Sequence, residues 1–356
     1  MAGEMEISNV RKGGPGPLDV LPVNTSNPFI WDNDTDADTF TQEFVMALAN
    51  NGTINLIGIS LSPHPYNGGK SEDLQAIVLK ARHSGWKNIP DATWDLGNLA
   101  MTALSRPASG NIDGTDPLDT APARMIRDQV LKAGTPSKPV VIGAGGALTT
   151  VASGYLLAKQ MGKAAEFASK VIVMADSGGY NGVPSMNGYN TGQDEWASYI
   201  CLARLKYIVV SFPDNHVGLP MIWDFIDTLP DNVLTRYMRA KKGPQWPYAD
   251  LHGDGDAGVV LAFLRPRQGD YFNQTTGIAF DHWGSWPAGW GKPGPQSQNW
   301  NCYLAELKVR VDPTSDNLMI SGYDQSVADS EWKKAVGGAS ATSNKVKPTL
   351  PAAGRN

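Results

Sequence analysis

The sequence has few cysteines, few histidines and no long apolar run. Its two cysteines, Cys201 and Cys302, provide neither a disulfide framework nor the spacing of a zinc site, and no two of its five histidines have metal-ligand spacing. No apolar stretch approaches the length of a membrane-spanning helix. The first residues also lack the apolar core of a secretory signal peptide. We therefore expect a soluble, cytoplasmic protein.

Positive charge is not in excess either. Lysine and arginine number 30 against 35 aspartates and glutamates, and the net charge of −5 gives no electrostatic basis for binding nucleic acid. A content of 41% apolar and 9% aromatic residues favours a packed core over disorder. The 356 residues are enough for one large domain or two ordinary ones.

Strand-like and helix-like segments alternate along the chain. The strand-like segments are apolar throughout, which is typical of parallel strands covered on both faces. We therefore predict an α/β fold, with a Rossmann-like, mostly parallel sheet and helices on both faces. The expected strands are 28–31, 54–62, 138–146, 170–179 and 206–214, and the expected helices are 39–51, 71–85, 121–134, 147–161 and 194–205. Residues 256–266 fit either a helix or a strand.

The domain organisation follows from changes in composition. We expect an extended arm at 1–23, one α/β domain at 24–330 with a loop-rich C-terminal portion, and a flexible tail at 331–356. The loop-rich portion contains several tryptophans, which could stack on a base or sugar or could pin a glycine- and proline-rich loop onto the domain. We prefer the second interpretation. These tryptophans are Trp283, Trp286, Trp290 and Trp300.

An aspartate cluster stands between the first expected strand and the first expected helix, in the sequence DNDTDAD at 32–38. Crowded carboxylates repel one another, so a bound cation is expected. Hard oxygen ligands would select Ca²⁺, with Mg²⁺ as the alternative. A strand followed by a helix N-terminus would place these carboxylates at the carboxyl edge of a parallel sheet, where ligands bind.

The aspartate cluster also fits an EF-hand loop or a helix cap. Asp32, Asp34, Asp36 and Glu43 match the first, third, fifth and twelfth positions of an EF-hand loop, although Ala37 stands where that loop needs glycine. The residues upstream also favour a strand over the entering helix of an EF-hand. In the helix-cap alternative, Asp36 or Asp38 caps the helix and the remaining carboxylates are solvated.

Four motifs in order resemble the inosine–uridine-preferring nucleoside hydrolases. That family opens with a strand, Asp-x-Asp-x-x-x-Asp-Asp, a helix and a second strand, and Asp32, Asp34 and Asp38 have this spacing. Its Gly-Pro-Leu-Thr-Asn turn matches 146–150, and its asparagine-rich loop ending in Glu-Phe-Asn matches 181–190. Its late His-Asp pair matches 255–256. The order and the rough intervals agree over about 27 to 265.

The resemblance implies a Ca²⁺-dependent hydrolase for the N-glycosidic bond of a ribonucleoside or related riboside. Asp34 would bind the ion and take a proton from the attacking water, and His252 is the candidate for protonating the leaving base. We also expect a homo-oligomer. The implied metal ligands are Asp34, Asp38, the Thr149 carbonyl and Asp256, and the implied ribose-binding residues are Asp38, Asn181 and Asn190.

Several positions depart from the family pattern. Thr39 replaces the second aspartate of the pair, for which Asp36 could compensate, and Gly188 replaces the glutamate of Glu-Phe-Asn. Gly255 replaces the late histidine. These losses fit a changed substrate, or a catalytically inactive descendant with a binding or self-assembling structural role.

The glycine-rich segment 143–148 offers a further alternative, an NAD-binding oxidoreductase. A strand leads in and a helix leads out, as in a dinucleotide-binding turn. However, Leu148 stands where the third glycine of that fingerprint belongs, and Asp176 lies further downstream than the usual ribose-binding acid.

Overall fold

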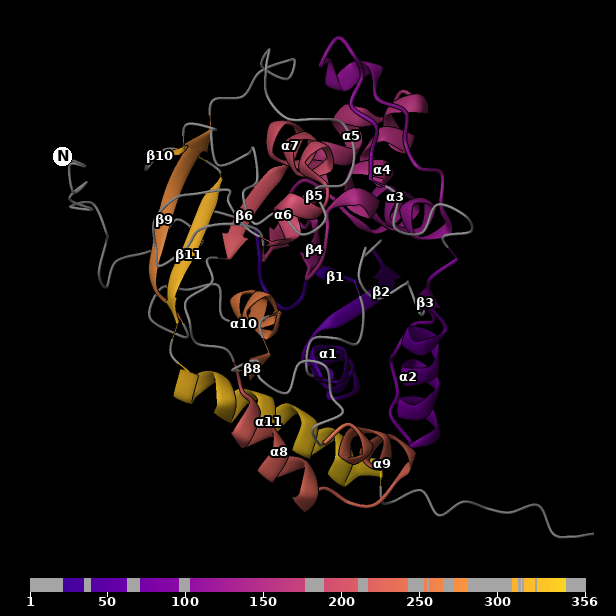
Figure 1. Ribbon diagram of the computed structural model, residues 1–356, viewed down its shortest axis with the longest axis vertical. Helices are drawn as coiled ribbons and strands as arrows, with labels where there is room; N and C mark the ends of the chain where they lie inside the picture. Colours follow the sequence, from indigo (N-terminus) through magenta and orange to yellow (C-terminus); the bar gives the residue numbers. More distant parts are fainter. Residues whose placement is uncertain are drawn as a thin grey trace, which may run out of the picture.

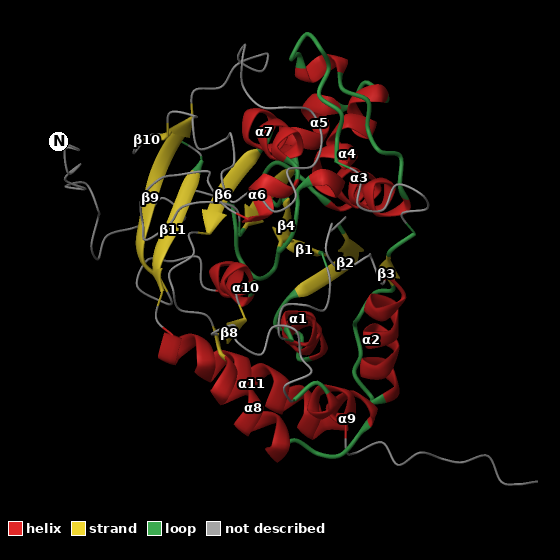
Figure 2. Cartoon of the chain, in the orientation of Figure 1, coloured by secondary structure: helices red, strands yellow, loops and turns green. Residues whose placement is uncertain are grey.

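The computed structural model describes residues 22–34, 40–62, 71–95, 103–176, 189–210, 217–242, 253–254, 256–264, 272–280, 309–312, 315, 317–323 and 325–343. These residues form a central sheet with helices packed on both of its faces (Figures 1 and 2). The predicted fold class is confirmed.

The sheet has nine strands in the order β10-β9-β11-β6-β5-β4-β1-β2-β3. The seven strands from β11 to β3 are all parallel, whereas β9 runs antiparallel to β11 and β10 antiparallel to β9. The strands are β1 (Pro28–Asn33), β2 (Asn55–Leu61), β3 (Ala92–Thr93), β4 (Val140–Ala144), β5 (Val171–Ala175), β6 (Lys206–Val210), β9 (Phe272–Phe280), β10 (Val309–Val311) and β11 (Leu318–Tyr323). A separate antiparallel pair consists of β7 (Val217–Gly218) and β8 (Gly253–Asp254).

The direction in which strands are added reverses beside β1. The chain places β2 and β3 on one side of β1, and then crosses over to place β4, β5 and β6 on the other side. In open α/β sheets, ligands bind beyond the carboxyl ends of the strands at such a reversal. The carboxyl ends of β1 and β4 are therefore where a site is expected.

Helices cover the two faces in two groups (Figure 1). One face packs against α1 (Thr41–Asn50), α2 (Ser71–His83) and α10 (Ala257–Leu264), and α8 (Leu219–Thr228), α9 (Val233–Ala240) and α11 (Gln325–Ser343) lie beyond these helices. The other packs against α3 (Ala121–Ala133), α4 (Thr149–Gln160), α5 (Ala164–Ser169) and α7 (Glu195–Arg204). The short helix α6 (Tyr189–Gln193) directly precedes α7, and a 3₁₀ turn spans Ile112–Gly114.

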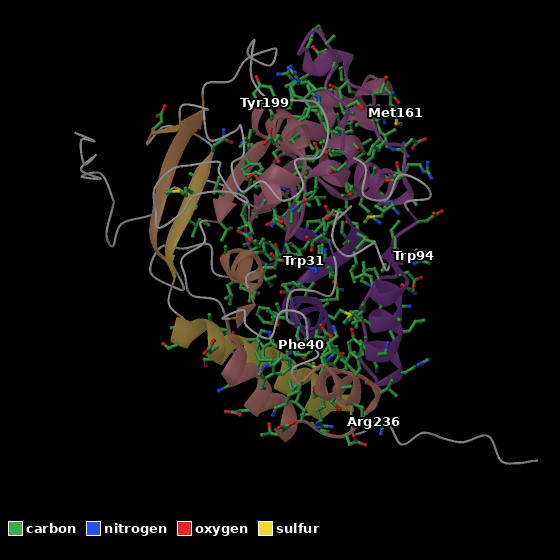
Figure 3. The ribbon with its side chains drawn as sticks, viewed as in Figure 1. Trp31, Phe40, Trp94, Met161, Tyr199 and Arg236 are labelled. Carbon is green, nitrogen blue, oxygen red and sulfur yellow. The ribbon has the colours of Figure 1, made fainter. Side chains whose placement is uncertain are left out.

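Side-chain alternation along the strands accounts for the two apolar clusters. In β4, Val141 belongs to the α1 side and Val140 and Ile142 to the α4 side. In β1, Trp31 and Ile30 separate in the same way. Trp31 is completely buried at the centre of the molecule (Figure 3). Because both faces are covered, most positions of these strands are apolar, which is why the sequence identified them.

The structure resolves the ambiguous segment and extends the sheet. Residues 257–264, which fitted either a helix or a strand, form α10, and all but one of them are fully buried or nearly so. The loop-rich C-terminal portion expected after residue 265 contributes three strands, β9 to β11. The four tryptophans between 283 and 300 lie outside the described residues.

The predicted flexible tail at 331–356 is wrong for residues 331–343. These residues belong to α11, where Trp332, Ala335, Val336 and Ala339 form a buried stripe at helical spacing. Trp332 packs near Phe44 of α1, with ring centroids 6.5 Å apart. Composition hid this helix because most of its residues are small or polar. Residues 344–356, and residues 1–21 of the arm expected at 1–23, lie outside the described residues.

None of the helices in the described part of the chain is both long enough and apolar enough to cross a bilayer.

Candidate functional site

Two consecutive glycines directly after β4 bring distant acidic residues together. The Gly145 amide donates to the carbonyl oxygen of Asp32 at 2.9 Å, which fixes this turn beside the end of β1. A Cβ added to Gly145 would overlap the carboxylate of Asp256, and one added to Gly146 would lie 2.7 Å from the Cβ of Asp34. Consecutive Cα atoms are about 3.8 Å apart. Asp34 and Asp256 therefore converge on the carboxyl edge of the sheet, at the strand-order reversal.

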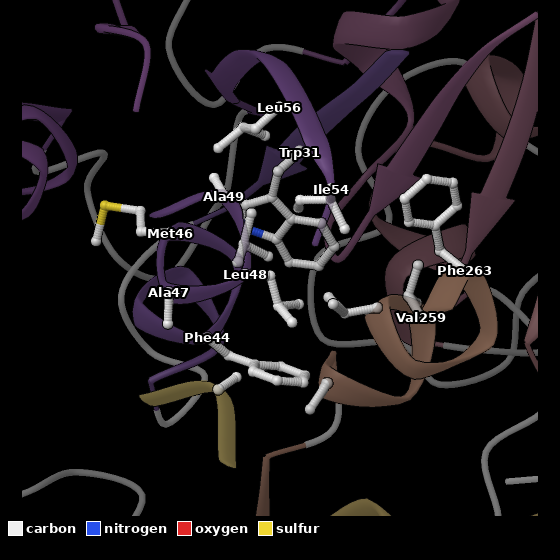
Figure 4. Packing of buried hydrophobic residues seen from close by; sticks show 14 of the residues in the cluster. Trp31, Phe44, Met46, Ala47, Leu48, Ala49, Ile54, Leu56, Val259 and Phe263 are labelled. Atoms are coloured by element: carbon white, nitrogen blue, oxygen red, sulfur yellow. The ribbon is translucent and has the colours of Figure 1, made fainter. Parts of the chain in front are cut away.

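The packing of α10 against β1 accounts for the position of Asp256 at this edge. Asp256 directly precedes α10, and its carbonyl accepts from the Val259 amide at 3.0 Å. Further along the helix, Phe263 stacks on Phe29 of β1 with ring centroids 4.4 Å apart, within the cluster shown in Figure 4. The strand that leads into Asp34 thus also anchors the helix that begins beside Asp256.

Asp32 forms a buried polar pair with Ser60 on the neighbouring strand. The two residues are partners in the parallel register of β1 and β2, and the Ser60 hydroxyl donates to Asp32 Oδ1 at 2.6 Å. Both residues are fully buried. Within the described structure, Asp32 Oδ2 has no hydrogen-bond partner. Burial raises the pKa of Asp32 to about 7, against the lowering effect of the Ser60 hydroxyl.

Ser62 lies two residues after Ser60, nearer the carboxyl edge of the sheet. Its amide donates to the Asn33 carbonyl at 2.9 Å, which continues the β1–β2 ladder past the last residue of β2. Successive side chains of a strand alternate between faces, so Asp32 and Asp34 share one face with Ser60 and Ser62. Ser62 is fully buried, and its hydroxyl has no hydrogen-bond partner in the described part of the chain.

Asp194 ties together three segments near the same edge. Its Oδ1 accepts from the Ala197 amide at 2.9 Å and so caps α7. Its Oδ2 accepts from the Leu104 amide at 2.9 Å and from the Thr149 hydroxyl at 2.7 Å. Burial raises the pKa of Asp194 to about 6, opposed by these three hydrogen bonds. This carboxylate holds the first residue of α4 in place.

Asn190 points its amide inward. Its Nδ2 donates to the Gly145 carbonyl at 3.1 Å and to the Asp176 carbonyl at 3.0 Å. Because a side-chain amide has two N–H donors, both are engaged with the backbone. A ribose hydroxyl could therefore use only Oδ1 of Asn190, as an acceptor.

The structure places four of the predicted site residues at one edge of the sheet. Asp34, Asp256 and Asn190 adjoin Gly145 and Gly146, and Thr149 follows three residues later. The roles assigned to these four remain predictions. Asp38, Asn181 and His252, like Thr39, Gly188 and Gly255, lie outside the described residues. Among the residues that are described, no group of three or more histidine, cysteine, aspartate or glutamate side chains is arranged to hold a metal ion.

The EF-hand and helix-cap alternatives for the aspartate cluster are wrong. An EF-hand needs an entering helix, but residues 28–33 form β1 and Asp32 lies within that strand. The helix-cap alternative fails because the N-cap of α1 is Phe40, which makes no side-chain cap hydrogen bond. Phe40 is buried with a φ of 66°, a left-handed conformation that costs an aromatic residue about 1 kcal/mol or more.

The geometry of the glycine turn also disfavours the dinucleotide-binding alternative. A bound pyrophosphate needs open space and backbone N–H groups above such glycines. Here the side chains of Asp34 and Asp256 lie against Gly146 and Gly145. Two carboxylates at this position repel a phosphate and attract a cation.

Asp32, Ser62 and Asp194 were not among the predicted site residues. The alternation in ISLS, with serines at 60 and 62 inside an otherwise apolar strand, was the available signal for Ser62. The same alternation in DND carries Asp32 and Asp34 on one face. For Asp194 no local pattern exists beyond a helix cap, because two of its partners lie in distant segments.

No protein-family model matches the sequence. No curated protein matches it either. Solved structures do. A purine-preferring ribonucleoside hydrolase from Gardnerella vaginalis shares 14% identity, with 88% of this chain and 99% of that chain covered and a TM-score of 0.53. An inosine-guanosine nucleoside hydrolase shares 15%, covering 86% and 98%, with a TM-score of 0.51. The type III effector protein XopQ, solved in complex with adenosine diphosphate ribose, shares 10%, covering 88% and 94%, with a TM-score of 0.52.

Identities this low establish the fold alone. The chain has a nucleoside hydrolase-like fold.

Proposed function

We propose that this protein hydrolyses the N-glycosidic bond of a ribonucleoside or related riboside at a Ca²⁺ site. The convergence of Asp34 and Asp256 on Gly145 and Gly146, within a nucleoside hydrolase-like fold, carries the proposal. Two of the solved structures that share the fold are nucleoside hydrolases, and a third holds a ribose-containing ligand.

The residues at the edge fit a hard cation. Their donors are carboxylate and hydroxyl oxygens, which suit Ca²⁺ or Mg²⁺. Asp32 Oδ2 and the Ser62 hydroxyl are buried without partners in the described structure, so this edge of the sheet has unused oxygen ligands. The carboxylates of Asp34 and Asp256, held beside adjacent glycines, also favour a positive charge between them.

Each residue then has a defined task. Asp34 binds the ion and accepts a proton from the attacking water, and Asp256 is the second carboxylate ligand. Asp38 and the Thr149 carbonyl complete the proposed set. When bound, the cation would lower the pKa of a water and attract the ribose hydroxyls. The carboxylates favour the positive charge that develops on the sugar as the bond to the base breaks.

Asn190, Asn181 and His252 provide the proposed substrate contacts. Asn190, held by the Gly145 and Asp176 carbonyls, presents Oδ1 to a ribose hydroxyl. Asn181 adds a second contact, and His252 protonates the leaving base. We also propose a cytoplasmic location and a homo-oligomeric state, the latter to be checked by light scattering.

A ribose-release assay tests the function. The full-length protein is incubated with inosine, guanosine, adenosine and uridine in Ca²⁺ and in EDTA, and free ribose is measured. Ca²⁺-dependent release from at least one nucleoside is the expected result, and the matched control is Asp34→Ala. Absence of release together with absence of Ca²⁺ uptake would refute the proposal.

A non-catalytic binding or structural role is the second candidate. Thr39, Gly188 and Gly255 replace residues that the resembling family uses, and one solved structure of the same fold is an effector protein holding adenosine diphosphate ribose. Adenosine diphosphate ribose is therefore included in the binding assays. Retention of this ligand without ribose release would favour the second candidate.

A further inference from the structure

Two serines on β2 and its extension differ in their hydrogen bonding. Ser60 and Ser62 lie on the same face, two residues apart, and both are fully buried. The Ser60 hydroxyl donates to Asp32, whereas the Ser62 hydroxyl has no partner among the described residues. Native proteins seldom leave a buried hydroxyl without a hydrogen bond or another ligand. Ser62 is therefore a candidate for contact with a bound species.

The position of Ser62 identifies where that species lies. A Cβ on Gly146 would be 2.5 Å from Ser62 Oγ and 2.7 Å from Asp34 Cβ, so the glycine Cα lies beside both side chains. The hydroxyl therefore lies near the side chain of Asp34, at the carboxyl edge of the sheet. Because Ser62 is fully buried, a single ion reaches its oxygen more readily than a sugar ring does.

We propose that the Ser62 hydroxyl is an oxygen ligand of the divalent cation, taking up the coordination that Thr39 does not provide as a carboxylate. This inference rests on the proposed function. With Asp38 and the Thr149 carbonyl, the resulting set joins the carboxylates of Asp34 and Asp256 to a neutral hydroxyl, and a lower ligand charge weakens Ca²⁺ binding relative to a site with one more carboxylate. The site is therefore a low-affinity Ca²⁺ site.

Calorimetric titration of the full-length chain with CaCl₂ tests the ligand directly. Ser62→Ala is compared with Ser340→Ala, which makes the same change at a fully buried serine in the remote helix α11. We expect the Ca²⁺ dissociation constant to rise about tenfold or more in Ser62→Ala and to stay at the wild-type value in Ser340→Ala. Circular dichroism in EDTA verifies that both variants are folded.

A change of ligand chemistry separates coordination from a merely structural role. Ser62→Cys replaces a hard oxygen with a soft sulfur, so it should weaken Ca²⁺ binding and strengthen Cd²⁺ binding relative to wild type. A structural role would weaken both ions or neither. This variant also keeps the test available if Ser62→Ala does not fold.

The outcomes distinguish the role of Ser62 from the proposed hydrolase function. Wild-type Ca²⁺ affinity in Ser62→Ala, or no gain of Cd²⁺ affinity in Ser62→Cys, would overturn the role of Ser62 and leave the hydrolase proposal to the ribose assay. A wild-type protein that binds no Ca²⁺ would overturn this inference together with the metal dependence of the proposed function.

Discussion

Replacing Asp32 with asparagine should stabilise the metal-free protein at neutral and alkaline pH. Burial raises the pKa of Asp32 from 3.8 to about 7, so the folded state holds this proton more tightly than the unfolded state. The free energy of unfolding therefore falls as pH rises through this interval and stays low above it. A shift of about three units corresponds to about 4 kcal/mol, since one unit is worth about 1.4 kcal/mol.

The substitution Asp32→Asn removes this pH dependence of the unfolding free energy and keeps the hydrogen bond with Ser60. Its side-chain oxygen can accept from the Ser60 hydroxyl as Asp32 Oδ1 does, at 2.6 Å in the wild type. Its amide must find new acceptors, and an unpaired buried N–H costs about 1–3 kcal/mol at every pH. The expected gain in unfolding free energy is therefore about 1–3 kcal/mol at pH 8, and near pH 4 it should turn into a loss, because only the cost of the unpaired amide remains there.

Urea unfolding in EDTA between pH 4.5 and pH 8.5 measures this difference. Asp194, whose pKa burial raises to about 6, adds a similar slope to both proteins and cancels in the comparison. Asp91→Asn is the control without pH dependence, because the hydrogen bond from Arg82 lowers the pKa of Asp91 from 3.8. That carboxylate stays ionised throughout this range and would lose its contribution to stability only at lower pH. Parallel wild-type and Asp32→Asn curves across the range would refute the argument.

Three further substitutions test the site. Asp34→Ala should abolish ribose release without unfolding the chain, because it removes a crowded carboxylate beside Gly146; a wild-type rate would refute its assignment. Thr39→Asp should tighten Ca²⁺ binding by restoring a carboxylate, and an unchanged dissociation constant would mean that the motif is aligned in the wrong register. Asp194→Ala should cost about 2 kcal/mol or more in urea unfolding, because it removes the α7 cap and leaves the Thr149 hydroxyl and the Leu104 amide unsatisfied. A loss below 0.5 kcal/mol, roughly the effect of a surface substitution, would show that Asp194 does not anchor these segments.

The central strands were predictable because they are buried on both faces. Such strands have few polar positions, so β2, β4, β5 and β6 stand out as apolar runs. The same property made α10 ambiguous, since a helix buried all round has no amphipathic period. Helix α11 was missed because alanines make up much of its buried stripe beside Trp332.

The site was predictable only in part. Asp34 and Asp256 were paired through the family resemblance, and the structure brings them together at Gly145 and Gly146. Ser62 and Asp194 depend on tertiary contacts, namely strand register in one case and distant backbone amides in the other. No local pattern encodes such contacts. The two hydrogen bonds of the Asn190 amide likewise depend on tertiary structure, because the Gly145 and Asp176 carbonyls come together only where the neighbouring strands β4 and β5 end.

The two carboxylates beside the glycine pair, those of Asp34 and Asp256, are far apart in the sequence and are therefore synthesised at different times. A nascent chain that has emerged as far as Lys242 already contains β1, β2, β4, β5 and β6, but it still lacks the residue that meets Gly145. Cleavage between 242 and 253 would similarly separate β1 to β6 from α10 and β9 to β11, while the Phe29–Phe263 stack and the pairing of β11 with β6 would still join the pieces. The proposed ion site can therefore form only late in translation, after the strands that support it.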